Sequence, residues 1–361
     1  MTTAILVIVI LVFLIVVHEL GHFFAAKLFG VTVEEFGIGY PPRAITITKI
    51  RGTEYTLNWI PFGGFVKLLG EEANATRVRG SLTDAPRWKQ AIILVAGVTM
   101  NVLAGWLLFT GAYALGVLHP VDSYSEGARL IVTDVVPGSP ADAAGIRLGD
   151  DVLALSDTRG AHLDAPTPEN VVAFVSERAG QEITIDFVHL GATSSAIIRP
   201  AHAVVPGESG RPAVGMGLAL VTTQAVPLSD AFVEGFRQTK AVFVLSWKGL
   251  WEIVSGFAQG GPNLQNVTGP VGLVSYVSEA AHSGFGYVLS LAAFISVNLA
   301  VINLIPIPSL DGGRLVLIGG EMVMRRSAPK LFVRFFNTLG VALIIMLMVA
   351  VTYQDIARLL T

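Results

Sequence analysis

Four long apolar runs dominate the pattern of hydrophobic and polar positions along this chain. They cover residues 4–29, 91–118, 285–307 and 331–351. Each run is long enough to cross about 30 Å of hydrocarbon as a helix. The first run has no basic segment before it and carries polar residues where a cleavage site would lie, which predicts a retained span and not a signal peptide. The pattern therefore predicts four transmembrane helices.

An alternation of apolar and polar residues follows the first run. Residues 45–48 (Ile-Thr-Ile-Thr) and 55–58 (Tyr-Thr-Leu-Asn) alternate on either side of residues 51–54 (Arg-Gly-Thr-Glu). A period of two residues around a turn that contains glycine is typical of a β-hairpin. The pattern itself leaves open whether this hairpin is purely cytoplasmic or also touches the membrane.

Residues 228–257 combine apolar positions at helical spacing with several charged side chains. They include Glu234, Arg237, Lys240, Lys248 and Glu252. This is too many charges for a transmembrane helix, and the segment also contains Trp247 and Trp251. We interpret it as an amphipathic helix in the outer membrane interface, with a fifth span as the alternative.

The composition supports a membrane protein with a soluble part. Of the 361 residues, 52% are hydrophobic and 14% are charged, which is too apolar for an ordinary soluble enzyme and too charged for a chain that lies wholly in lipid. The chain has no cysteine. Disulfides and thiolate ligands are therefore excluded, and any zinc must be held by histidine and carboxylate side chains.

The distribution of basic residues predicts the orientation. Nine Lys or Arg residues lie between the first two spans (27–89), and five more lie between the last two (314–334). The long segment 119–284 has nine Lys or Arg residues against seventeen Asp or Glu residues. By the positive-inside rule, the short basic loops face the cytoplasm, and the acidic segment and both termini lie outside.

The first apolar run contains the sequence His18-Glu19-Leu20-Gly21-His22. On a helix, the two histidines project from one face and can bind one metal ion, and Glu19 can reach a water molecule bound to it. Such a pentapeptide also occurs by chance in soluble proteins. Each ionisable residue at the centre of a membrane helix costs about 2.5–3.5 kcal/mol, however, so three in little more than one turn favour a metal site.

A third ligand is expected from residues 303–313, at the end of the third run. Pro306 and Pro308 interrupt this run just before Asp311, which places a carboxylate at a membrane depth comparable to that of the histidines. The alternative is that Asp311 only caps a helix after an interfacial turn.

These motifs together resemble the intramembrane site-2 metalloproteases, specifically the bacterial RseP/RasP type. The resemblance rests on the His18–His22 motif and on Asn303-Leu-Ile-Pro-Ile-Pro with Leu310-Asp-Gly, and it extends over nearly the whole chain. It also includes Phe36-Gly-Ile-Gly, Pro61-Phe-Gly-Gly-Phe-Val-Lys with Gly70-Glu71, and Thr268-Gly-Pro-Val-Gly. It implies a multi-pass α-helical fold with a membrane-dipping β element at the hairpin, whose exposed edge could pair with an unwound substrate.

Carried over to this chain, the resemblance implies Zn²⁺ bound by His18, His22 and Asp311, with Glu19 as general base. It also implies a set of residues that handle substrate near the metal: Asn101, Asn303, Pro306 and Pro308. Asn298 precedes Asn303 by little more than one helical turn, so we expect it to face the same cavity; the alternative for these polar residues is hydrogen bonding between helices. The family pattern Gly-Pro-x-x-Asn-Phe in the second span departs here, because residues 97–102 lack both the Pro and the Phe. This departure flanks Asn101 and touches no metal ligand.

The outer segment resembles a PDZ domain, as expected for the same family. Residues 131–136, 137–150 and 152–155 match its strand, helix and strand. If the domain is circularly permuted, Gly215, Met216, Gly217 and Leu218 form the loop whose backbone N–H groups receive a peptide carboxylate. The chain contains one such copy, where some relatives carry two.

We therefore divide the chain into an N-terminal membrane core (1–118), a PDZ-like extracytoplasmic α+β domain (122–222), an interfacial helix (228–257) and a C-terminal membrane core (285–361). The expected function is a zinc endopeptidase of the bacterial cytoplasmic membrane. It would cut single-span membrane proteins, such as anti-sigma factors already trimmed by an upstream site-1 type protease, or remnant signal peptides. Its other expected partner is the lipid bilayer, and no nucleic acid partner is expected.

Two other classes of function fit the sequence less well. A scaffold without protease activity could use the PDZ-like domain to hold envelope proteins, but it would not need Glu19 beside a metal site. A metal transporter would need more than one ligand cluster and a continuous polar path through the spans, and the sequence offers neither.

Overall fold

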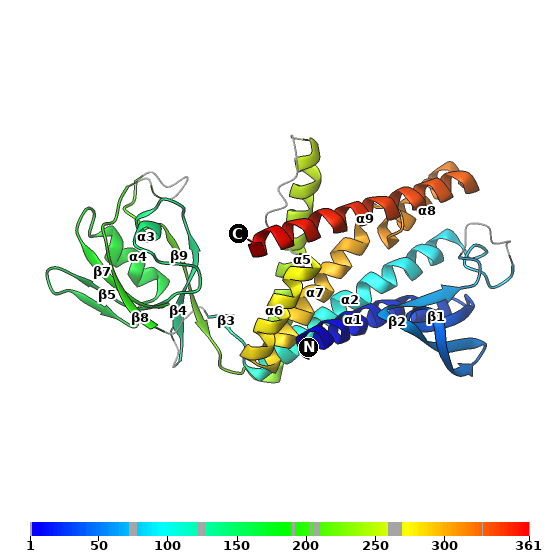
Figure 1. The fold of residues 1–361 in the computed structure, drawn as a ribbon, viewed down its shortest axis with the longest axis horizontal. Helices are drawn as coiled ribbons and strands as arrows, with labels where there is room; N and C mark the ends of the chain where they lie inside the picture. Colours follow the sequence, from blue (N-terminus) through cyan, green and yellow to red (C-terminus); the bar gives the residue numbers. More distant parts are fainter. Residues whose placement is uncertain are drawn as a thin grey trace. The chain divides into compact units, whose positions relative to one another are not determined.

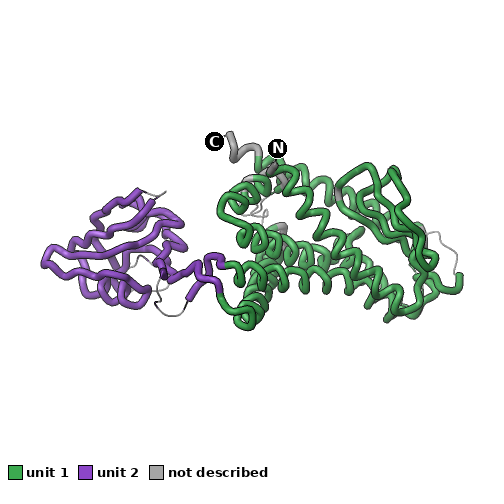
Figure 2. The backbone as a smooth tube through the Cα atoms, turned by 90° about the horizontal axis from the view of Figure 1, so that it is seen from below, with its two compact units in different colours: residues 1–115, 226–361 green, residues 116–225 purple. Residues whose placement is uncertain are grey.

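The computed structural model describes residues 2–71, 78–121, 124, 127–189, 192–202, 204, 210–258, 269–326 and 328–360. The chain forms two compact units (Figures 1 and 2). Residues 1–115 and 226–361 make up the membrane unit, and residues 116–225 make up the inserted unit. In the described part of the chain, four helices have the length and apolar composition to cross a membrane: Thr3–Leu28, Arg87–Leu115, Phe285–Leu304 and Leu331–Asp355.

These four helices agree with the four predicted spans. They belong to α1 (Thr2–Leu28), α2 (Arg87–Leu115), α7 (Phe285–Leu304) and α9 (Lys330–Leu360). The third span ends three residues earlier than predicted, because the residue that precedes a proline is disfavoured in the helical conformation and Pro306 follows Ile305. The second span ends at Leu115, before Gly116, whose φ is +83°.

Helices α1, α2 and α7 pack closely through small residues. Gly21 of α1 lies against the carbonyl of Ala96, and a methyl group in its place would be 2.8 Å from the Cα of Gly97. Gly105 of α2 lies against Val297 of α7 in the same manner. Without side chains at these positions, the backbones approach closely, which is how helices associate in lipid.

The predicted hairpin is present and is longer than expected. It consists of β1 (Val33–Ile50) and β2 (Thr53–Leu68), which pair antiparallel around a turn at Arg51 and Gly52, both with positive φ. Each strand is long enough to bend, so that Phe36 lies opposite both Val66 and Tyr55. Residues 33–40 therefore lie between the two halves of β2, and residues 63–68 lie at one edge of the sheet.

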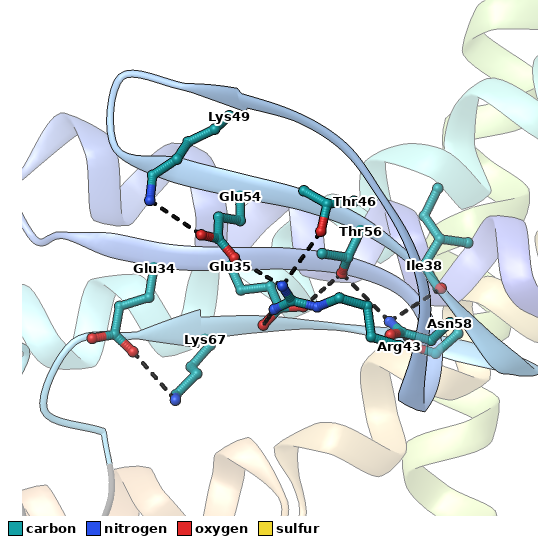
Figure 3. A network of polar contacts seen from close by, with 11 residues as sticks. Glu34, Glu35, Ile38, Arg43, Thr46, Lys49, Glu54, Thr56, Asn58 and Lys67 are labelled. Atoms are coloured by element: carbon teal, nitrogen blue, oxygen red, sulfur yellow. Dashed lines mark hydrogen bonds and ion pairs between the residues drawn. The ribbon is translucent and has the colours of Figure 1, made fainter.

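The two faces of this sheet differ. Phe36 and Val66 pack with Ala26 of α1 in an apolar cluster. On the opposite face, shown in Figure 3, Arg43 bonds Glu35 at 2.8 Å and Glu54 at 3.0 Å. Glu35 also accepts a hydrogen bond of 2.7 Å from Thr56. Arg43 thus joins the two halves of the bent β1 to the first half of β2.

Three further helices complete the membrane unit: α5 (Leu228–Ala258), α6 (Pro270–Ser283) and α8 (Asp311–Met324). Helix α5 matches the predicted amphipathic segment and packs against α2, where the indole of Trp106 donates to the carbonyl of Phe232 at 2.8 Å. Its interfacial position in a membrane remains a prediction. Helix α6 is tied to α9 by Asp355, which accepts hydrogen bonds from the N–H groups of Gly269 and Gly272.

The inserted unit is built on an antiparallel sheet with two short helices. The strand order is β3-β9-β4-β5-β7-β8, and β6 pairs with β5. Its elements are β3 (His119–Pro120), β4 (Arg129–Val135), α3 (Pro140–Ala143), β5 (Asp151–Asp157), β6 (His162–Asp164), α4 (Pro168–Ser176), β7 (Ile183–His189), β8 (Ala192–Ile198) and β9 (Met216–Thr222). The predicted strand, helix and strand correspond to β4, α3 and β5. The unit is a little longer than the predicted 122–222, because β3 pairs with β9.

The inserted unit has its own core and a buried ion pair. Leu130, Ile146 and Leu155 are buried in a single cluster with residues of β7 and α4. Beside this core, Asp157 accepts a 2.8 Å hydrogen bond from Arg178, whose guanidinium also lies over the Phe174 ring. The Arg178 guanidinium and two backbone N–H groups hold the pKa of Asp157 below its usual value.

We expect Asp157→Asn to lower the thermal midpoint of the inserted unit by several degrees at neutral pH, because Arg178 loses its charged partner. The pKa of Asp157 is lowered by folding, so its stabilisation is complete above the unfolded-state pKa of about 3.9 and is lost as the pH falls through the lower folded-state pKa. Circular dichroism of residues 116–225 between about pH 2 and pH 7 measures the difference from wild type, which should vanish in strong acid.

The control is Asp164→Asn, because Asp164 is 80% exposed and pairs only with the half-exposed His162. Exposed pairs contribute little, so the midpoint should stay within about 1 °C of wild type. An equal loss of stability in both variants would contradict the assignment of Asp157.

Candidate metal centre

Three side chains from two distant segments converge in the membrane unit. His18 and His22 lie one turn apart on α1, and Asp311 is the first residue of α8. The Asp311 Oδ2 atom is 3.1 Å from His18 Nε2 and 3.3 Å from His22 Nε2, and the two Nε2 atoms are 3.0 Å apart. Both histidines are buried at 8% exposure. The ligand-type atoms of all three residues therefore face one point inside the unit.

Helix α2 supplies the wall behind the two imidazoles. A methyl group at Gly97 would lie 2.5 Å from His22 Nε2 and 2.8 Å from His18 Cε1, which is too close for any real contact. Glycine at this position is thus required for the rings to lie between α1 and α2. The close contact of Gly21 with Gly97 brings the two helices together at the same level.

The position of Asp311 follows from the prolines and glycines around it. Helix α7 ends before Pro306, and Ser309 takes a positive φ of 75°, so the chain reverses and enters α8 at Asp311. Gly312 and Gly313 then pack directly on the carbonyls of residues 304, 305 and 307, where no side chain fits. The reversal returns the carboxylate toward α1.

The outer nitrogens of both imidazoles have neighbours that orient the rings. His22 Nδ1 lies 2.8 Å from the carbonyl of Ile93, so it carries the proton and leaves Nε2 unprotonated. His18 Nδ1 lies 3.4 Å from the Asn101 side-chain amide, whose Oδ1 is buried without a hydrogen bond. Rotating this amide by 180° exchanges its nitrogen and oxygen, and His18 Nδ1–H can then donate to Oδ1.

This arrangement fits a divalent metal ion. With both Nδ1 atoms protonated, neither Nε2 atom can donate to Asp311, and Asp311 Oδ2 is buried without a hydrogen-bond partner. Burying an unpaired carboxylate oxygen is unfavourable, whereas two imidazole nitrogens and one carboxylate oxygen are a typical three-ligand set of catalytic zinc. In the described part of the chain, this is the one cluster of His and acidic side chains with metal-ligand spacing.

The three residues lie at the wall of a cavity of about 340 Å³. Glu19 also lines it, and one Glu19 oxygen accepts a 3.0 Å hydrogen bond from the backbone N–H of Val66 in β2. A carboxylate beside the ligand cluster can serve as a base for water. The cavity thus contains a candidate metal site, a candidate base and the edge of a β-strand.

The remaining candidate residues of the membrane unit are only partly brought together. Asn101 and Asn303 line the cavity. The lining formed by the described residues does not include Pro306, Pro308 or Asn298. Asn298 instead donates to the carbonyl of Phe294 on its own helix at 2.9 Å, so the expectation that it faces the cavity is wrong in this structure. The two prolines act on the path of the chain.

Sequence reasoning assigned no role in the cavity to several of the residues that line it. Tyr40, Glu71 and Arg314 line it, and Glu71 forms an ion pair with Arg314. Arg314 follows Asp311 by three residues and therefore lies on the same side of α8, which helical spacing could have indicated. Its pairing with Glu71 could not be found this way, because the two residues are 243 positions apart.

In the inserted unit, the residues predicted as a peptide loop lie beside a hollow of about 80 Å³ between α4 and β9. Only Gly215 precedes the strand; Met216, Gly217 and Leu218 begin β9 and pair with β4, so the prediction of a loop is wrong for these three residues. Gly215, Met216 and Leu218 line the hollow together with Val171 and Val175 of α4, and Gly217 does not. Gly215 has a positive φ of 81°, and its carbonyl accepts a hydrogen bond from Val136 N–H. The binding of a peptide terminus here remains a prediction.

Comparison with known proteins identifies relatives along the whole chain. Residues 6–347 match Peptidase family M50. The protein named "Putative zinc metalloprotease CPE1693" of Clostridium perfringens is 35% identical over 344 residues, which cover 95% of both chains. The "Zinc metalloprotease RasP" of Oceanobacillus iheyensis is 26% identical over 439 residues, covering 99% of this chain and 100% of that one. Among solved structures, the PDZ domain of an SdrC-like protein from Listeria monocytogenes is 17% identical and covers 27% of this chain and 93% of its own, with a TM-score of 0.21.

We expect Gly97→Ala to weaken zinc binding by about 10- to 100-fold, because the added methyl group displaces both imidazoles from the common point. Zinc content and chelator competition of the purified protein measure this effect without any substrate. Gly111→Ala on the same helix is the matched control, since its methyl group would meet only the end of the Leu289 side chain at 3.2 Å. Unchanged zinc affinity in Gly97→Ala would contradict this description of the site.

Proposed function

Because the chain belongs to peptidase family M50, the site-2 zinc metalloproteases, we propose that it cuts single-span membrane proteins within or beside their transmembrane helix. The observation that carries this proposal is the convergence of His18, His22 and Asp311 between helices that are apolar enough to span a membrane. A hydrolytic site between membrane-spanning helices has access to peptide bonds within the bilayer, which soluble proteases do not reach.

In this proposal, His18, His22 and Asp311 hold the zinc ion. Bound zinc supplies a Lewis acid that activates water and polarises a peptide carbonyl. Glu19 lines the same cavity and accepts the proton of the attacking water, and it then delivers a proton to the leaving amine. Asn101 orients His18 from behind, and Asn303 contacts the substrate in the cavity.

The β-sheet offers a way to receive an unwound substrate. Peptide bonds in a membrane helix are shielded because every backbone group is already paired. Val66 and Leu68 line the cavity at the edge of the sheet, so an extended substrate segment can pair there as an added strand. The exposed apolar side chains of Ile45, Trp59 and Ile60 would place the bent end of the sheet in lipid.

The basic loops indicate the location and orientation. They support our proposal that the cavity lies toward the cytoplasmic side of the bacterial cytoplasmic membrane and the inserted unit outside. The substrates proposed are anti-sigma factors already trimmed by a site-1 type protease, or remnant signal peptides. Regulated intramembrane proteolysis is the corresponding cellular role.

We expect Glu19→Gln to reduce cleavage of a tagged single-span substrate by at least about 100-fold, because the amide cannot accept the proton of water. The assay uses purified protein in detergent, and a zinc chelator should abolish wild-type cleavage in the same way. Glu34→Gln is the control, since Glu34 pairs with Lys67 on the sheet away from the cavity lining. Equal cleavage by wild type, Glu19→Gln and chelated enzyme would reject the proposal.

The inserted unit is proposed to act as a steric filter that excludes substrates with bulky outer domains. Deletion of residues 122–222 should then allow cleavage of untrimmed substrate to a level within about threefold of that of trimmed substrate. The readout is the ratio of the two cleavage rates, compared with that of the full chain. Loss of cleavage for both substrates would instead favour a binding role for the unit, in which the hollow near Gly215 receives a newly formed C-terminus.

A further inference from the structure

The cavity-facing edge of β2 has backbone donors that are already occupied. Val66 N–H donates to Glu19 at 3.0 Å, and Leu68 N–H donates to Glu71 at 3.2 Å. In an antiparallel strand, N–H groups two residues apart point to the same side. Leu69 N–H accordingly points the other way and donates to the carbonyl of Thr32. Two carboxylates thus cover two consecutive donors on the edge at which we propose that substrate pairs.

The two carboxylates are held differently. No protein cation pairs with Glu19 among the described residues, so its hydrogen bond to Val66 can be exchanged for one from water or substrate. Glu71 uses its second oxygen to pair with Arg314 of α8, three residues after Asp311. Both partners line the cavity and are partly buried, at 24% and 37% side-chain exposure. A charge-assisted pair that is partly desolvated is stronger than an exposed one, so Glu71 is the more firmly fixed.

The path from Leu68 to the metal site is short and continuous. Leu68 N–H contacts Glu71, Glu71 contacts Arg314, and one turn of α8 connects Arg314 to Asp311. The end of the docking edge is therefore tied to the same helix that carries a proposed zinc ligand. A substrate strand can replace Glu19 at Val66, whereas it meets an occupied donor at Leu68.

Resting on the proposed function, we infer that Glu71 and Arg314 determine the scissile bond by limiting the register of the substrate strand. Because the side-chain period of a strand is two, a strand that slips along the edge does so in steps of two residues when it keeps the same face. Leu68 N–H is occupied by Glu71 and cannot donate to a substrate carbonyl. The register that needs this hydrogen bond is therefore excluded. Arg314 acts through Glu71 as a positioning residue, and neither residue takes part in the proton transfer.

The test maps cleavage sites by mass spectrometry on one trimmed single-span substrate. Wild type should cut mainly at one bond. Glu71→Ala frees the Leu68 donor, so a second cut two residues away should appear and account for at least about a third of the product. Arg314→Gln loosens Glu71 and should give the same second cut at a smaller fraction. Glu71→Gln retains one oxygen, which can still accept from Leu68 N–H, but it loses the charged pair with Arg314. Its second cut should therefore be no larger than that of Arg314→Gln.

The control for a general disturbance of the sheet is Glu34→Gln. This change removes the exposed ion pair between Glu34 of β1 and Lys67, which precedes Leu68 in β2, and it should leave cleavage at one bond. One unchanged bond in wild type, Glu71→Ala and Arg314→Gln would overturn this inference and leave the proposed function intact. Loss of all cleavage in both Glu71→Ala and Glu71→Gln, with zinc binding retained, would also overturn it, because the Glu71 carboxylate would then serve catalysis itself. Failure of the wild type to cut, or Glu19-independent cutting, would reject the proposed function and this inference with it.

Discussion

Two imidazoles lie against a glycine of the neighbouring helix, and the remainder of the membrane unit is arranged around this contact. Gly97 provides the room between α1 and α2 that His18 and His22 occupy, and Gly21 allows the two backbones to approach at that level. Polar ligands buried among apolar helices are costly unless they are paired or bind an ion. The two Nε2 atoms and Asp311 Oδ2 lie within 3.3 Å of one another, so one metal ion could bind all three and offset the cost of burying them.

The other parts of the site serve to deliver groups to this point. The prolines and glycines between α7 and α8 reverse the chain so that Asp311 returns toward α1. The bent sheet brings Val66 and Leu68 to the cavity, and its outer face is held together by Arg43 and its two carboxylate partners (Figure 3). One helix, α8, carries both Asp311 and Arg314, so the proposed metal ligand and the end of the sheet share a rigid support.

The agreement between sequence and structure varies with the range of the interactions involved. The four spans, the turn at Arg51 and Gly52, and helix α5 follow from local periodicity, and each lies close to where the pattern predicted it. The bend that folds β1 and β2 over themselves was not predicted, because it depends on contacts of the sheet with itself and with α1. Asn298 was expected in the cavity from its position near Asn303, but helical geometry turns its side chain onto the backbone of its own helix.

By itself, the sequence determined the chemistry available to this protein. It specified apolar segments long enough to span a membrane, two histidines on one helical face, the Glu19 carboxylate beside them and Asp311 after two prolines. Helical spacing is a local property, so these features can be read without knowledge of the fold. Only the tertiary structure decided which distant groups meet. The approach of Asp311 to His18 and the pairing of Glu71 with Arg314 join residues that are hundreds of positions apart, and such contacts depend on how the helices and the sheet pack, which no local pattern encodes.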